Sequence, residues 1–242
     1  MNSILRVNTL LSKKYFRISQ NCGICSYKAV IFDMGGVILP SPFNAAYKWE
    51  KKHGFEKGTI FKAIKHNKND GAWSQLERGE LSLEEFYSPF AKEVTNVHSD
   101  ISVSPEMIEN FMENLTRELS RPNEDMIAII KNLKNHGIKT ALLTNNWMSS
   151  KKGRLIFDGI EHFDEIIESC LVGMRKPEMK IYKHTLDNLG VSAKESIFLD
   201  DIPGNLKPAN ELGITTIHVP NVSSALTQLQ NILEIDLGNI HK

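Results

Sequence analysis

Apolar residues between positions 122 and 219 alternate between the spacing of buried strands and that of amphipathic helices. Short apolar segments predict strands at 138–143, 166–167, 196–199 and 215–219. Helical spacing of apolar residues predicts helices at 126–133, 177–189 and 205–212. Because these strands are short and separated by helices, we expect an α/β fold with a doubly wound, mostly parallel sheet and helices on both faces.

The first predicted strand lies nearer the N-terminus and ends at an acidic side chain. Residues 29–37 form an apolar strand that runs into Asp33 and then into a bend containing Gly35 and Gly36. Open α/β sheets place their active sites at the carboxyl ends of strands, which makes Asp33 a candidate functional residue. An aspartate after a strand can also be only a helix cap.

Residues 42–120 follow a different pattern, with amphipathic helical stripes and no predicted strand. The stripes cover 43–53, 59–66, 83–94 and 105–119. We interpret 42–120 as a helical cap inserted into an α/β core formed by 28–41 and 121–220, with a C-terminal helix and tail at 221–242. Because the insertion directly follows the Asp33 strand, we expect it to cover that strand's end as a lid; a separate helical domain is the alternative.

Charge and composition limit the classes of partner. The 242 residues carry 29 Lys and Arg against 29 Asp and Glu, so no overall positive field attracts nucleic acid. No apolar run has the length of a transmembrane segment. The three cysteines are too few and too unevenly placed for a secreted disulfide framework, which indicates a reducing compartment. The residue types predict no oligomeric state.

Residues 1–27 stand apart as a leader or a tail. The first acidic residue of the chain is Asp33, whereas basic side chains occur earlier, at 6, 13, 14 and 17. A basic, acid-free segment interleaved with apolar residues is typical of a mitochondrial presequence. The alternative is a disordered tail on a cytoplasmic protein.

Polar residues also follow the later strands, and one pair of them is hard to explain as purely structural. Thr144 and Asn145 could form a cap or a turn, and Lys176 could be a solvated loop residue. Asp200 and Asp201, however, follow an apolar strand directly. Two adjacent carboxylates repel one another unless a cation or a lysine lies nearby. We therefore expect these strand ends to converge on one pocket.

The residue types at these strand ends suit phosphoryl transfer, which needs a nucleophile, a cation and donors aimed at the phosphate oxygens. Asp33 is the expected catalytic nucleophile, because a carboxylate can form an aspartyl phosphate without a base. The Thr144 hydroxyl and the Asn145 amide can donate to phosphate oxygens. Lys176 supplies a mobile positive charge to the phosphate and to the catalytic site.

Together these segments resemble the signature motifs of the haloacid dehalogenase-like hydrolase superfamily, at 32–37, 143–145, 176–177 and 198–201. Segments 144–147, 168–178 and 198–209 are similar to the N-terminal phosphatase domain of soluble epoxide hydrolases, and to the related domain at the front of an acyl-CoA dehydrogenase fusion protein. The resemblance spans 28–219. It implies a capped α/β fold, Mg²⁺, an aspartyl-phosphate intermediate, and a small phosphorylated metabolite or lipid phosphate as substrate.

Metal-binding residues are expected among the same strand ends. Mg²⁺ requires hard oxygen ligands, for which Asp33, the Gly35 carbonyl and Asp201 are the candidates. The resemblance assigns Asp201 to the metal-binding aspartate of the family. It also implies that Asp200 and Asn205 lie behind the ligands and orient the lysine or the waters on the metal.

Gly35 departs from the family pattern, because phosphatases of this superfamily normally carry a second aspartate at that position. That aspartate acts as general acid and then as general base, a contribution of roughly 10²- to 10⁴-fold. Its absence predicts either a phosphatase restricted to good leaving groups, such as anomeric sugar, acyl or aryl phosphates, or a nearly inactive phosphate-binding or interaction module. A metal-independent dehalogenase is a third alternative, against which Asp200 and Asp201 argue.

Overall fold

The computed structural model describes residues 27–98, 102–149 and 153–238. The predicted leader, with its possible mitochondrial role, therefore lies outside the described residues. Within the described ranges, no helix is long and apolar enough to cross a membrane.

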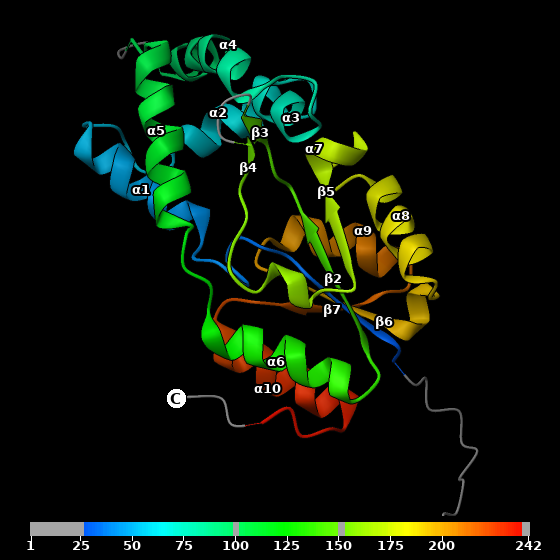
Figure 1. The fold of residues 1–242 in the computed structure, drawn as a ribbon. Coiled ribbons are helices and arrows are strands. Elements are labelled where there is room, and N and C mark those ends of the chain that lie inside the picture. Colours follow the sequence, from blue (N-terminus) through cyan, green and yellow to red (C-terminus); the bar gives the residue numbers. More distant parts are fainter. Residues whose placement is uncertain (1–26, 99–101, 150–152, 239–242) are drawn as a thin grey trace, which may run out of the picture.

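The core of the protein is a five-stranded sheet in the order β5-β2-β1-β6-β7 (Figure 1). Its strands are β1 (Ala29–Phe32), β2 (Lys139–Thr144), β5 (Glu165–Glu168), β6 (Ser196–Asp200) and β7 (Thr215–His218). Every neighbouring pair in this sheet is parallel. The predicted α/β fold class is thus confirmed, and β1 is the central strand.

Residues of β1 alternate between two apolar layers. Val30 and Phe32 belong to one buried cluster, which includes residues of α6 (Glu124–Asn135) and α10 (Val222–Leu233). Ala29 and Ile31 belong to a second buried cluster, which contains residues of α8 (Met179–Leu189) and α9 (Pro203–Glu211). Successive side chains of a strand point to opposite faces, so a continuously apolar strand requires helices on both sides.

The predicted insertion contains only helices among its described residues. They are α1 (Pro42–Lys52), α2 (Thr59–Asn67), α3 (Ala72–Glu77), α4 (Leu83–Val97) and α5 (Pro105–Glu118). Figure 1 shows them as a layer beyond the carboxyl ends of the sheet strands. Aromatic rings hold the layer together; Phe86 and Phe90 stack with centroids 4.7 Å apart, and Trp73 packs against both rings.

Several short elements were not predicted. The strands β3 (Met148–Ser149) and β4 (Gly153–Arg154) pair antiparallel after β2, and α7 (Ser169–Val172) follows β5. The helix predicted from position 177 begins at Met179, because Glu178 is still extended and forms the N-cap. The short turns η1 (Ile160–His162) and η2 (Ala193–Glu195) precede β5 and β6, and Ser192 and Glu195 form a capping box at η2.

Candidate active site

The order of the strands brings the predicted polar residues to one edge of the sheet. β1 lies between β2 and β6, so the residues that end these three strands are neighbours. Thr144 is the last residue of β2, Asp200 is the last residue of β6, and Asp33 follows β1 directly. The backbone N–H of Asp33 donates to the Leu199 carbonyl at 2.9 Å, which continues the parallel pairing of β1 with β6 as far as Asp33.

Lys176 lies between two carboxylates at this edge. Its Nζ donates to Asp33 Oδ1 at 2.5 Å and to Asp200 Oδ2 at 2.8 Å. The side chain is only 1% exposed, so the expected mobile charge is instead a fixed one. Burial alone would lower the pKa of the Lys176 ammonium, but the negative charges of Asp200 and Asp33 outweigh burial and raise that pKa. Both carboxylates therefore favour the charged form of Lys176.

Asp200 is held by hydrogen bonds that leave it little freedom. Its Oδ1 accepts from the Ile202 backbone N–H at 2.8 Å, and Asn205 Nδ2 donates to both carboxylate oxygens at 3.1 Å. With Oδ2 also bound to Lys176, the carboxylate has its acceptor sites occupied. Asp200 and Asn205 thus lie where they orient Lys176.

Three carboxylates come together beside this lysine. Asp33, Asp200 and Asp201 each offer an oxygen atom within 4.8 Å of the others. Burial, together with the charge of Asp200, raises the pKa of Asp201 to about 6. Burial also raises the pKa of Asp33, against the attraction of Lys176 and with added repulsion from the other two acids. The cluster therefore has an excess of negative charge when its acids are ionised.

The donor set at this cluster fits a divalent cation. Asp201 Oδ2 accepts a long hydrogen bond of 3.4 Å from Ser41, whereas Asp201 Oδ1 is buried and has no hydrogen-bond partner among the described residues. A buried carboxylate oxygen without a partner is costly unless an ion or a water satisfies it. Mg²⁺ accepts such oxygens and would neutralise the surplus of two charges that three carboxylates leave against one ammonium.

Gly36 makes room for the Asp201 carboxylate. Its φ is +81°, and a Cβ atom there would overlap Asp201 Oδ2. We expect Gly36→Ala to unfold at a lower temperature, since the left-handed conformation alone costs a non-glycine residue roughly 1–2 kcal/mol. Stabilisation by added Mg²⁺ should also decrease because Asp201 is displaced. Thermal melting with and without Mg²⁺ measures both effects; an unchanged response to Mg²⁺ would contradict the placement of Asp201 at a metal site.

Asn145 differs from its predicted role. Its side-chain Nδ2 donates to the Lys176 carbonyl at 3.0 Å and to Glu77 Oε2 at 3.1 Å, and its Oδ1 accepts from the Lys176 N–H at 2.8 Å. Both amide protons are therefore used within the protein in this arrangement, and the predicted donation to phosphate, which stays a prediction, would require the amide to release one of these two partners. Thr144 is buried, and among the described residues its hydroxyl makes only a 3.4 Å contact, with the Asn145 carbonyl, so it can turn toward a phosphate oxygen.

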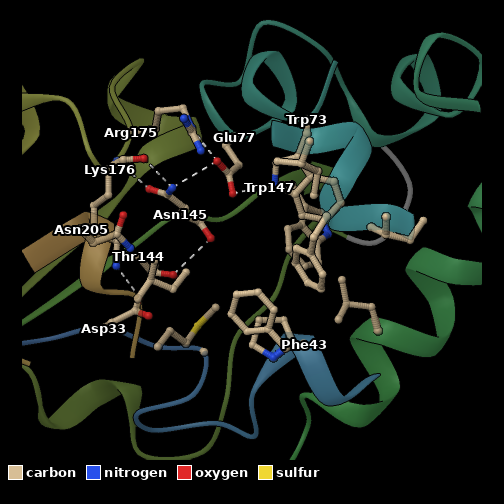
Figure 2. A pocket seen from close by; sticks show the side chains of 18 of the residues that line it. Asp33, Phe43, Trp73, Glu77, Thr144, Asn145, Trp147, Arg175, Lys176 and Asn205 are labelled. Carbon is tan, nitrogen blue, oxygen red and sulfur yellow. Dashed lines mark hydrogen bonds and ion pairs between the residues drawn. The ribbon is translucent and has the colours of Figure 1, made fainter. Parts of the chain in front are cut away.

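A cavity of about 270 Å³ extends from Asp33 toward the cap. Figure 2 shows Asp33, Thr144 and Lys176 on one side of it and aromatic rings on the other (Figure 2). Most of the wall is apolar, with contributions from Phe43, Phe61, Trp73, Phe111, Leu115 and Trp147. The cavity therefore joins a charged end at the sheet to an apolar end at the cap.

Sequence reasoning missed several residues of this cavity. Trp73 and Trp147 both line the cavity, and nothing in the sequence separates them from tryptophans that only pack in the core. Glu77 and Arg175 lie between the cap and the sheet edge, where Arg175 Nε donates to Glu77 Oε2 at 2.5 Å. The adjacency of Arg175 to Lys176 was visible, but nothing in the sequence identified Glu77 as its partner.

Fold and strand ends together define a parallel α/β protein with a helical cap over a cluster of three carboxylates. The family model of the haloacid dehalogenase-like hydrolases matches residues 27–213. The chain belongs to this family, and the resemblance inferred from its motifs is confirmed.

The chain is similar to parts of longer proteins and to one protein of similar length. It is 36% identical over 214 residues to acyl-CoA dehydrogenase family member 10 of Mus musculus, covering 88% of the chain and 20% of that protein. It is 33% identical over 220 residues to bifunctional epoxide hydrolase 2 of Sus scrofa, covering 87% and 39%. It is 28% identical over 213 residues to the sesquiterpene phosphatase astK of Aspergillus oryzae, covering 86% and 97%. The chain thus spans well under half of the first two relatives.

Solved structures show the same fold. A HAD family enzyme of Bacteroides thetaiotaomicron, BT-2542, in complex with magnesium and inorganic phosphate, superposes with a TM-score of 0.54 at 23% identity, covering 83% of this chain and 98% of that one. At this level of identity the match supports the fold, and the chemistry has to be argued from the chain's own residues.

Proposed function

We propose that the protein is a Mg²⁺-dependent phosphatase that forms an aspartyl phosphate on Asp33 and acts on phosphate monoesters carrying an apolar tail. The observation that carries this proposal is the arrangement of Asp33, Lys176 and Asp201 at the charged end of a largely apolar cavity. Being a hydrolase follows from the family; the metal, the reaction and the substrate class are the proposal.

Asp33 is the nucleophile in this proposal. Lys176 holds Asp33 Oδ1, which leaves Oδ2 as the atom that attacks phosphorus. The new O–P bond forms as the bond from phosphorus to the ester oxygen breaks, and the leaving oxygen takes a proton from water. A second water then attacks phosphorus and gives a proton to the hydroxide left by the first, which breaks the bond between Asp33 and phosphorus, releases inorganic phosphate and restores the Asp33 carboxylate. Lys176 and the Thr144 hydroxyl face the phosphate oxygens throughout.

Asp33, Asp201 and the Gly35 carbonyl are the groups that would hold Mg²⁺. When bound, the ion supplies positive charge that offsets both the carboxylate cluster and the phosphate oxygens. The chain's own contribution is to hold Asp33 in place: β1 and β6 fix its backbone, and Lys176 fixes its carboxylate. This order before the substrate binds reduces the reorganisation needed in the transition state.

Gly35 limits the leaving groups that the proposed enzyme can release. No side chain at this position can protonate the departing oxygen, so general acid catalysis worth roughly 10²- to 10⁴-fold is missing there. Esters of acidic alcohols, such as aryl phosphates, need this proton least. We therefore propose that turnover is fastest for stable leaving groups and slow for simple alkyl phosphates.

The apolar cavity supports a substrate with an apolar tail. Ligand pockets fix orientation with few polar groups and gain affinity from apolar walls. Here the polar groups lie at one end and aromatic side chains line the rest, which fits a phosphate head group followed by a hydrocarbon. A relative of similar length is named a sesquiterpene phosphatase, and sesquiterpenes are hydrocarbons of this kind.

One observation favours a second function, that of a catalytically weak phosphate-binding module. Gly35 removes the expected acid and base, while the groups that would bind phosphate remain. The dehalogenase alternative is less well supported, because a clustered third carboxylate is unnecessary for a metal-independent aspartyl ester. Halide release from 2-chloropropionate in EDTA would favour it.

The proposed function is tested with a series of 4-alkylphenyl phosphates whose tails lengthen from none to hexyl. The leaving group stays nearly constant in this series while apolar area increases. Each buried methylene is worth about 0.8 kcal/mol, so kcat/KM should rise by up to about fourfold per carbon until the cavity is filled. Activity should disappear in EDTA and return with Mg²⁺. Glucose 1-phosphate serves as the polar comparison.

Two results would contradict this proposal. Hydrolysis that persists in EDTA would exclude dependence on Mg²⁺. A flat series, with faster turnover of glucose 1-phosphate, would exclude the apolar tail. Binding of inorganic phosphate without turnover of any ester would instead support the phosphate-binding module.

A further inference from the structure

Glu77 reaches from the cap to the sheet edge. It is the last residue of α3, and its side chain is 10% exposed. Oε1 accepts from Trp73 Nε1 at 2.9 Å, whereas Oε2 accepts from Arg175 Nε at 2.5 Å and from Asn145 Nδ2 at 3.1 Å. One cap carboxylate thus binds two residues of the α/β core (Figure 2).

Asn145 continues this connection to the catalytic lysine. Its side-chain oxygen and nitrogen contact the backbone N–H and the carbonyl of Lys176, so the amide holds both sides of that residue's main chain. The same Lys176 donates from Nζ to Asp33. A chain of direct contacts therefore runs from the cap through Glu77, Asn145 and Lys176 to the nucleophile.

Trp73 connects the chain of contacts to the substrate cavity. Its ring lines the apolar wall, and its indole N–H is bound to Glu77. A hydrocarbon tail in the cavity therefore contacts a ring that is hydrogen-bonded to the carboxylate holding Asn145. Trp73 is therefore the side chain that links a tail filling the cap to the position of Lys176 at the phosphate end of the cavity.

We propose that Glu77 is a positioning residue, which holds the segment carrying Lys176 against Asp33 when the cap is closed. The proposal rests on the phosphatase function proposed above. Glu77 acts through Asn145 and Arg175 and does not touch the reacting atoms. It is poorly suited to replace the missing acid at Gly35, since its two oxygens already accept from three donors.

An ion pair that only attached the cap to the core would not affect the position of Lys176. The neighbouring Arg78 also joins the cap to the core, through Glu178 at 3.8 Å, but no hydrogen bond of Arg78 reaches Asn145 within the described residues. Both arginines lie in the same interface, with exposed side-chain fractions of 12% for Arg175 and 13% for Arg78. The Arg78 pair is thus a matched control for general attachment of the cap.

The experiment compares Glu77→Gln with Arg78→Gln in the full chain. Glutamine has one acceptor, so at least one of the three N–H donors around position 77 loses its partner. We expect Glu77→Gln to lower kcat on 4-hexylphenyl phosphate by about 10- to 100-fold, as for other residues that orient catalytic groups, with KM within about threefold. Arg78→Gln should leave both constants within about threefold of the wild type.

Hydrogen exchange supplies a readout that does not need activity. The Lys176 amide, which donates to Asn145 Oδ1, should exchange faster in Glu77→Gln and at the wild-type rate in Arg78→Gln, because only the first variant releases Asn145. Should Glu77→Gln melt below the assay temperature, Arg175→Gln replaces it, with the same expected loss of kcat.

Equal losses of kcat in Glu77→Gln and Arg78→Gln would overturn the positioning role and indicate mere attachment of the cap. Unchanged exchange of the Lys176 amide would overturn it as well. A wild-type protein without phosphatase activity would overturn the proposed function instead, and exchange alone would then decide whether Glu77 orders the Lys176 segment.

Discussion

Replacement of Asp33 by asparagine is expected to lower turnover of aryl phosphates by roughly 10⁴-fold or more, as loss of a covalent nucleophile does in other enzymes. An amide is a poor nucleophile, and the substituted side chain could not form the acyl phosphate. Lys176 would still be bound to Asp200, so the site keeps most of its geometry. Steady-state assays with 4-nitrophenyl phosphate in Mg²⁺ measure the effect.

The same substitution is expected not to destabilise the protein in metal-free buffer. Burial and the two neighbouring carboxylates raise the pKa of Asp33, so the ionised Asp33 side chain is unfavourable in the folded protein. The substitution removes this carboxylate, and melting should occur at an equal or higher temperature. Asp187→Asn, on the exposed surface of α8, is the matched control for loss of an acid. Activity above about 10% of wild type in Asp33→Asn would exclude Asp33 as the nucleophile.

Gly35→Asp is expected to increase turnover of hexyl phosphate by roughly 10²- to 10⁴-fold, because it restores a general acid next to the nucleophile. The gain on 4-nitrophenyl phosphate should stay below tenfold, since that leaving group departs without a proton. The ratio of the two gains is the measurement. Equal gains on both substrates would contradict the leaving-group argument.

The structure can accommodate a side chain at position 35. Unlike Gly36, Gly35 is not in the left-handed region, and a Cβ there would meet only Pro42 Cδ at 3.2 Å and Cγ at 3.5 Å among the described residues. Pro42 begins α1, so a shift of a few tenths of an ångström is needed at the base of the cap. Gly35→Asn is the control variant: it has the same size and cannot donate a carboxyl proton, so it should not reproduce the gain.

The fold and the charged end of the cavity were predictable from the sequence. Buried parallel strands are recognisable as short apolar segments, and their carboxyl ends must lie at one edge of the sheet. Asp33, Thr144 and Asp200 could therefore be placed together before any coordinates were known. Lys176 was predicted to supply positive charge there, but a lysine before a proline in a loop has no periodic pattern that would show it fixed between Asp33 and Asp200.

The cap end of the cavity was not predictable in the same way. α3 has only six residues, which is too short for an apolar stripe, so Glu77 had no visible context. Asn145 was correctly located at a strand end, but the direction of its amide depends on Glu77 and on the Lys176 backbone. Amphipathicity shows that a helix is packed, and it does not show which of its buried side chains face a cavity.

The apolar wall has a consequence for the pace of the proposed reaction. In the proposed reaction a hydrocarbon tail would make the same contacts with the cavity wall, which includes Trp73 and Phe111, before and after the phosphate is removed. Such uniform binding favours capture of scarce substrate but does not accelerate bond breaking. It also delays departure of the freed alcohol, so the longest tails that the cavity accepts should be taken up most readily and let go most slowly.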